Sequence, residues 1–195
     1  MSEQEYQDAI QKFEWEDLVA AWRIRHEANF LKEWAQGKFF EYAIIRAFEI
    51  EGATVRYPYR ISSPSYISDD EDTLEQIDGV IYIDGLSFLV ESKDYAATNI
   101  DIEPLAKLQV RLKRRPSPVV GCLFTASDFT WPAQALIETL MPHTILLWNK
   151  ADIDYCFEHH CFIKGLRLKY KSVIEDCNHM LDISTYANIT EKPAL

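Results

Sequence analysis

The sequence predicts an α/β domain, in which a buried hairpin is followed by alternating helices and strands. The hairpin is indicated by two apolar runs within residues 76–95, separated by Asp84-Gly85, a dipeptide that tolerates positive φ at both positions. Further along, amphipathic helical segments alternate with short apolar runs, the order typical of βαβ units with parallel strands. These segments are 103–116 (helix), 119–126 (strand), 131–141 (helix) and 144–149 (strand).

The segments before the hairpin are expected to be mostly helical. Residues 3–35 carry apolar side chains at helical spacing and predict two amphipathic helices, whose Trp15, Trp22 and Trp34 could form a homodimer or protein-partner surface. Residues 37–52 predict a third helix that ends at Gly52. Residues 54–61 contain Pro58 and predict an edge or bulged strand.

Two further segments are a polar loop before the hairpin and a basic helix near the C-terminus. Residues 62–75 are polar and without periodicity, so they predict a loop whose acids are solvated rather than gathered around a cation. Residues 162–181 predict a closing helix with a basic cluster at Lys164, Arg167, Lys169 and Lys171.

Composition indicates a single globular domain over residues 1–195. Hydrophobic residues make up 48% of the chain and aromatic residues 13%. We expect a helical extension over 1–36, a core over 37–150 and a second extension over 151–195. Because no run of about 18 apolar residues occurs and the N-terminus is acidic, we expect a cytoplasmic protein with no membrane partner.

The charge distribution and the cysteines indicate whether the protein could bind nucleic acid or zinc. A net charge of −11 argues against binding nucleic acid by bulk electrostatics, but the acids concentrate in residues 1–20 and 69–75 and leave the remainder nearly neutral. The four cysteines are expected to be reduced. Cys156, His159 and Cys161 could bind zinc, although paired half-sites are absent and buried thiols explain these residues equally well.

The hairpin places two carboxylates opposite each other. If Asp84-Gly85 is the turn, Asp78 faces Glu91, and like charges at this position repel. Burying two carboxylates together is costly unless a cation or a proton sits between them, and a divalent metal would resolve the conflict. Oxygen ligands favour Mg²⁺ or Mn²⁺, with the backbone carbonyl of Ser92 as a further ligand. Lys93 returns to the same face of the strand and could reach whatever the metal holds. The pattern therefore indicates hydrolytic chemistry.

These residues resemble the PD-(D/E)xK restriction-endonuclease-like nucleases over roughly residues 37–150. The resemblance implies a central mixed sheet flanked by helices, with an αβββαβ core. It implies that Asp78 and Glu91 bind the metal and that Lys93 orients the attacking water or stabilises the transition state. Glu41 would be a helix-borne further ligand, unless it is simply a solvated glutamate. Restriction, repair and defence nucleases all use this fold.

The helix after the hairpin could contact the substrate. Lys107, Arg111 and Arg114 recur on one helical face and suit phosphate contact, although a merely solvated face would look the same. By the resemblance, Gln109 lies where many of these nucleases carry a glutamine, while Lys113 replaces the tyrosine of the QxxxY subgroup. The leading hypothesis is a Mg²⁺-dependent nuclease acting on DNA, and the alternative is a catalytically silent binding or assembly module.

Overall fold

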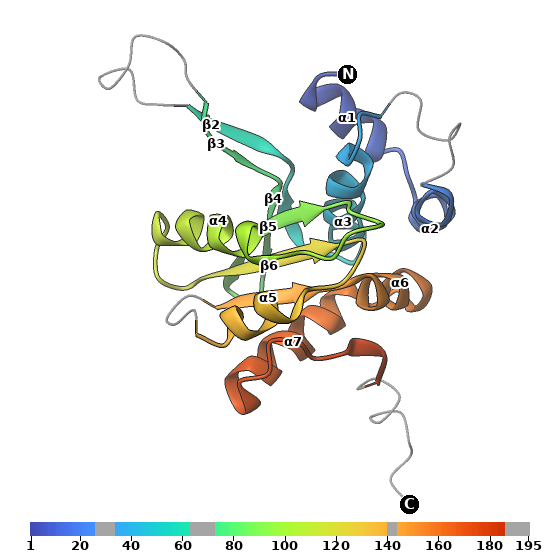
Figure 1. Cartoon of the computed structure of the whole chain (residues 1–195). Helices are drawn as coiled ribbons and strands as arrows, with labels where there is room; N and C mark the ends of the chain where they lie inside the picture. The colour runs from blue at the N-terminus through green and yellow to red at the C-terminus, as the bar shows by residue number, and fades with distance from the viewer. Residues whose placement is uncertain (26–33, 63–72, 140–143, 186–195) are drawn as a thin grey trace, which may run out of the picture.

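The computed structural model describes residues 1–25, 34–62, 73–139 and 144–185. Its centre is a five-stranded sheet in the order β1-β4-β5-β6-β7 (Figure 1). The pairs β1/β4 and β4/β5 are antiparallel, whereas β5/β6 and β6/β7 are parallel. The strands are β1 (Thr54–Arg56), β4 (Gly79–Ile83), β5 (Leu86–Lys93), β6 (Val119–Thr125) and β7 (Ile145–Trp148).

Helices cover both faces of this sheet. One hydrophobic core joins α1 (Glu3–Ile10), α2 (Trp15–Ile24), α3 (Lys38–Ile50), α6 (Lys150–His159) and α7 (Phe162–Asp176) to one face. A second core joins α4 (Ile102–Lys113) and α5 (Trp131–Ile137) to the other face. The order α3-β1-β4-β5-α4-β6 confirms the expected mixed sheet flanked by helices and its αβββαβ succession.

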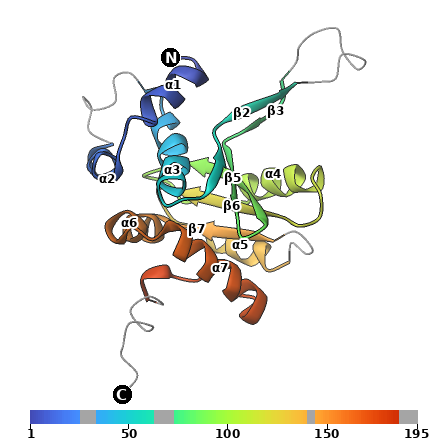
Figure 2. The same ribbon diagram turned by 180° about the vertical axis from the view of Figure 1, so that it is seen from behind.

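A smaller two-stranded sheet extends away from the centre (Figure 2). It pairs β2 (Tyr59–Ser62) with β3 (Thr73–Ile77). The expected single strand over 54–61 is therefore two strands in two sheets, interrupted at Tyr57 and Pro58, because proline offers no backbone N–H to a ladder. The expected loop over 62–75 is wrong for Ser62, the last residue of β2, and for residues 73–75, which belong to β3, and residues 63–72 lie outside the described residues.

The register of the hairpin is the predicted one. Gly79 pairs with Val90 and Ile83 pairs with Leu86, around a turn in which Asp84 has φ 52° and Gly85 has φ 77°. This register places Asp78, directly before β4, opposite Glu91. Gly79 has φ 156°, and a Cβ there would lie 2.4 Å from the Cδ1 of Ile45, so this position beside α3 requires glycine.

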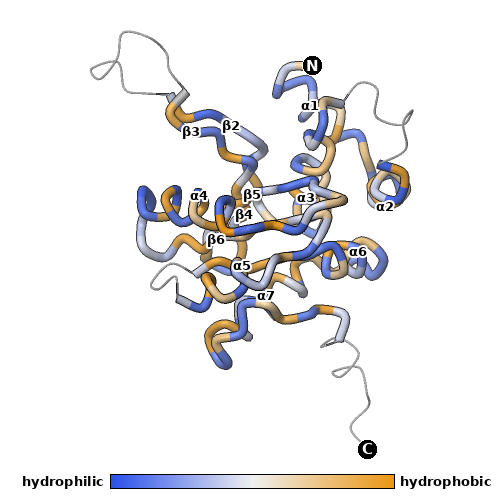
Figure 3. Tube along the Cα trace, in the orientation of Figure 1, coloured by the Kyte–Doolittle hydropathy of each residue, from blue (hydrophilic) through white to orange (hydrophobic). Residues whose placement is uncertain are grey.

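The helices mostly agree with the sequence. The periodicity of α4 buries Leu105, Leu108 and Leu112, and hydrophobic and hydrophilic residues alternate along this helix (Figure 3). The expected helix over 131–141 ends at Ile137, and residues 140–143 lie outside the described residues. The sequence analysis did not predict α6. None of the described helices is long and apolar enough to cross a membrane.

The three N-terminal tryptophans pack against the core, and a homodimer or protein-partner surface on these helices stays a prediction. Trp22 is 3% exposed, and its Nε1 donates to Asp154 at 2.7 Å. Trp15 stacks on His160 with 3.7 Å between ring centroids, and Trp34 stacks on Tyr6. The rings therefore stabilise the attachment of α1 and α2 to the core.

Candidate functional site

The end of the β4–β5 hairpin brings three of the predicted residues together. The backbone N–H of Ser92 donates to Oδ2 of Asp78 at 2.8 Å, and Nζ of Lys93 lies 2.7 Å from Oε1 of Glu91. Asp78 is 7% exposed and Glu91 is 2% exposed, so both carboxylates are shielded from water. The register of the hairpin therefore brings two buried carboxylates and one lysine side chain to the same end of the hairpin.

Glu41 approaches the same place from the first turn of α3. Burial, and then the negative charge of Asp78, raise the pKa of Glu41 to about 7, although Lys38 donates to its carboxylate at 2.6 Å. Burial likewise raises the pKa of Asp78, against the opposing effects of the Ser92 N–H and the charge of Lys93. Both shifts come first from burial, which the neighbouring hydrogen bonds and cations do not fully offset.

The donor set fits a hydrated Mg²⁺ or Mn²⁺ ion. Among the described residues, no three His, Cys, Asp or Glu side chains gather closely enough to form a metal cage. Mg²⁺ does not need one, because it commonly uses one or two carboxylates and keeps several waters. Asp78 and Glu91 would be the two carboxylates, and the backbone carbonyl of Ser92 would be a third oxygen donor.

A cavity of about 330 Å³ opens beside these groups. It is lined by Glu41, Ser92 and Lys93, and by Gln36, Gly37, Asp94 and Tyr95. Gly37 is the N-cap residue of α3, and its φ of 78° allows the chain to turn into this helix one turn before Glu41. The cavity provides space for a ligand next to the lysine.

The possible zinc ligands are arranged differently. Sγ of Cys156 and Sγ of Cys161 are 3.8 Å apart, while the ring of His159 packs against Tyr155. In the described part of the chain no third ligand joins them. None of the four cysteines, all of which are described, forms a disulfide, and burial raises the pKa of Cys156. Cys156 is therefore buried in the core, whereas His159 is exposed at the end of α6.

The sequence analysis missed a buried glutamate that organises the arginines of α4. Glu75 of β3 is 7% exposed and accepts two hydrogen bonds of 3.0 Å from Arg115. Nη1 of Arg114 lies 3.8 Å from the same carboxylate. Arg111 bridges Glu75, at 3.4 Å, to Glu91, which its Nη1 contacts directly. Arg111 therefore connects Glu91 of β5 to Glu75 of β3.

This arrangement bears on the predicted substrate contacts of α4. Lys107 forms an exposed ion pair with Glu103 at 2.9 Å, and Gln109 is half-buried. The side chain of Arg114 is 45% exposed, whereas that of Arg111 is 20% exposed and lies between two carboxylates. The phosphate-binding role of these residues stays a prediction, and Arg111 would have to leave Glu91 to perform it.

Replacing Glu75 by glutamine is expected to lower the free energy of unfolding by about 1–3 kcal/mol, because three arginines lose their shared, shielded carboxylate. Urea unfolding measures this change. The matched control is Glu103→Gln, which removes an exposed carboxylate on α4 and should change stability by less than about 1 kcal/mol. Equal losses in both variants would contradict the structural role of Glu75.

Comparisons with known proteins yield structural neighbours at low identity. No protein-family model matches the sequence, and no curated protein matches it. The chain is similar to a solved protein of unknown function, AF1548, with 13% identity, 78% of this chain and 76% of that chain covered, and a TM-score of 0.45.

Two restriction endonucleases are also similar in structure. AspBHI, a DNA modification-dependent restriction endonuclease, has 18% identity over 81% of this chain and 38% of its own, with a TM-score of 0.40. MspJI, solved in complex with a 27-mer oligonucleotide, has 14% identity over 93% of this chain and 39% of its own, with a TM-score of 0.44. The chain spans about two fifths of the length of these two enzymes. Its chemistry has to be sought in its own side chains.

Proposed function

We propose that this protein is a metal-dependent nuclease that hydrolyses phosphodiester bonds in DNA, as restriction, repair or defence nucleases do, and that it acts in the cytoplasm. The observation that carries the proposal is the meeting of Asp78 and Glu91 at the end of the hairpin, with Lys93 at 2.7 Å from Glu91. Two shielded carboxylates and an ammonium group beside a cavity suit a hydrated divalent cation and an anionic substrate.

In this proposal each residue of the site has a distinct role. Asp78, Glu91 and the Ser92 carbonyl hold Mg²⁺ or Mn²⁺, and Glu41 would add a ligand from α3 after moving toward the two other carboxylates, because the three do not gather closely in the described part of the chain. The bound ion would supply a polarised phosphate and a more acidic water. Lys93 orients that water or stabilises the negative charge that develops on the phosphate.

The cations that now neutralise Glu91 must make room for the metal. Arg111 contacts Glu91 and Glu75 together, so it can leave Glu91 and still keep a carboxylate partner. Lys93 is 24% exposed and can turn toward the cavity. A metal ion can therefore replace these two cationic side chains at Glu91. Arg111 then keeps Glu75 as its partner and Lys93 faces the substrate phosphate, so no unpaired charge is left in the core.

Metal binding separates this proposal from the catalytically silent module. Titration calorimetry with Mn²⁺ is expected to show binding to the wild-type chain and affinity about tenfold weaker or worse for Asp78→Asn, which keeps the shape but removes the charge. Glu175→Gln, an exposed carboxylate on α7, is the control and should bind as the wild type does. Absence of wild-type binding at millimolar Mn²⁺ would favour the silent module.

A further inference from the structure

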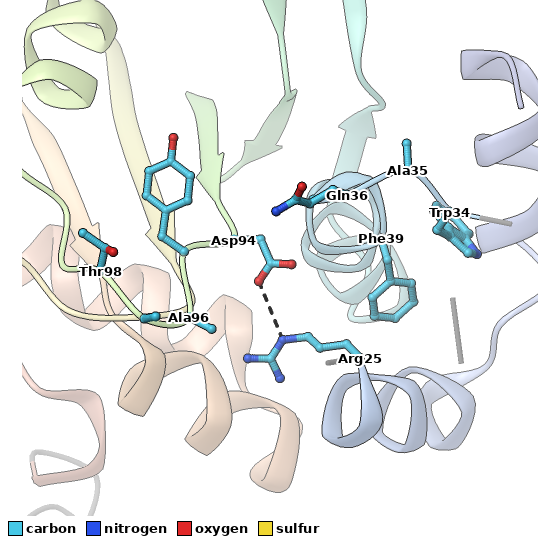
Figure 4. A pocket seen from close by; sticks show the side chains of 11 residues that line it. Arg25, Trp34, Ala35, Gln36, Phe39, Asp94, Ala96 and Thr98 are labelled. Atoms are coloured by element: carbon cyan, nitrogen blue, oxygen red, sulfur yellow. Dashed lines mark ion pairs between the residues drawn. The ribbon is translucent and has the colours of Figure 1, made fainter. Parts of the chain in front are cut away.

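A larger cavity adjoins the proposed catalytic site. It has a volume of about 610 Å³ and lies between the end of α2, the segment before α3 and the segment after β5 (Figure 4). Gln36, Gly37, Asp94 and Tyr95 line both this cavity and the one beside Glu41 and Lys93. A ligand that fills the larger cavity would therefore touch the boundary of the catalytic site.

The base of the cavity holds a buried arginine with spare hydrogen-bond donors. The side chain of Arg25 is 4% exposed, its guanidinium lies 3.4 Å from the ring centroid of Trp22, and its Nη1 donates to the Trp22 carbonyl at 2.6 Å. Among the described residues, Nε and Nη2 of Arg25 have no hydrogen-bond partner. Buried donors without acceptors are costly, so a ligand that brings acceptors to Arg25 would be stabilised here.

The charges in the cavity favour a neutral ligand over a phosphate. Nε of Arg25 lies 4.0 Å from Oδ1 of Asp94, and Figure 4 shows the two side chains pointing toward each other. An anion that reached the guanidinium would also meet the Asp94 carboxylate, which would repel it. A neutral group with ring nitrogens or carbonyl oxygens can accept from Arg25 without that repulsion.

The walls of the cavity favour a flat aromatic ligand. Trp34, Phe39 and Tyr95 line it. Trp34 is already stacked on Tyr6 and Phe39 is 2% exposed, so Tyr95, 50% exposed at the rim, is the ring open to stacking. Aromatic side chains bind nucleobases by stacking, and every base has a π-face for this contact. A base pair within a duplex presents only its edges, so an unpaired base is required.

We infer that this cavity binds one unpaired nucleobase of the substrate strand, next to the phosphodiester group at the proposed metal site. The inference rests on the proposed function and specifies its substrate class: a nucleic acid in which the nucleotide beside the cleaved bond is single-stranded or flipped out of the helix. Arg25 reads the edge of the base, and the ring of Tyr95 stacks on its face.

The test uses a short single-stranded oligodeoxynucleotide with a central 2-aminopurine, whose fluorescence is quenched by stacking. Binding to the full chain is measured in EDTA, so that cleavage does not interfere. We expect quenching by the wild type, about tenfold weaker binding by Arg25→Met, which removes the donors, and similar weakening by Ala97→Leu, which narrows the cavity from its exposed rim. Ala20→Leu on the exposed side of α2 is the matched control and should leave binding unchanged.

The outcomes distinguish this inference from the proposed nuclease function. Metal-dependent cleavage with equal quenching by wild type, Arg25→Met and Ala97→Leu would overturn the base site and leave the nuclease intact. Quenching that both variants weaken, without cleavage in any metal, would support the base site and overturn the nuclease. Displacement of the probe by inorganic phosphate alone, or equal binding of a fully paired duplex, would overturn the assignment to an unpaired base.

Discussion

Replacing Lys93 by methionine is expected to lower metal-dependent cleavage by roughly 10²–10⁴-fold. The change keeps the length of the side chain and removes the ammonium group that would orient water or stabilise the transition state. Folding should survive, because Glu91 keeps its contact with Arg111 and the side chain of Lys93 is partly exposed. Initial cleavage rates on a labelled oligonucleotide with Mg²⁺ or Mn²⁺ measure the effect.

Metal affinity gives this prediction a second measurement. Lys93 competes with any cation for Glu91, so Lys93→Met should bind Mn²⁺ at least as tightly as the wild type, while Asp78→Asn should lose both binding and cleavage. Lys171→Met removes an exposed lysine of α7 and should retain full activity. Cleavage by Lys93→Met at the wild-type rate would show that this lysine has no part in the chemistry.

Sequence reasoning succeeded where short-range rules determine the structure. Asp84-Gly85 fixes the turn, the turn fixes the register, and the register places Asp78 opposite Glu91. The helical spacing of Leu105, Leu108 and Leu112 similarly predicts the buried face of α4. In each case the deciding residues are neighbours along the chain or across one tight turn, so the amino-acid types alone carry the information.

The buried charges could not be found in this way, because their partners are distant in sequence. Glu75 lies beside an acidic run and looks solvated until β3 brings it to Arg115, forty residues away. Arg25 and Asp94 meet only after α2 and the end of β5 are placed together. In contrast, α6 carries a local signal that was overlooked: Asn149 and Asp152 form a capping box at its N-terminus.

The basic cluster of the closing helix conceals an internal ion pair with a large expected effect on stability. Lys169 is 1% exposed, its Nζ lies 2.7 Å from Asp152, and it also donates to the Leu181 carbonyl at 2.6 Å. Asp152 is 3% exposed and also accepts from the Ile183 N–H at 2.9 Å. This pair joins α6, α7 and the segment that follows α7.

Lys169→Met is therefore expected to lower the free energy of unfolding by about 3–5 kcal/mol, because it leaves the Asp152 carboxylate buried without a cation. Urea unfolding provides the measurement. Lys171→Met, two residues along the same helix, removes an exposed lysine 3.7 Å from Glu175 and should cost less than about 1 kcal/mol.

A double variant separates the lost charge pair from lost packing. Combining Lys169→Met with Asp152→Asn removes both charges, so the loss should be smaller than the sum of the two single losses. Strict additivity would mean that Lys169 stabilises the fold through its packing alone, including its ammonium 5.4 Å from the Trp148 ring centroid. A sub-additive result would establish the ion pair as the connection between α6 and α7, on the face of the sheet opposite α4.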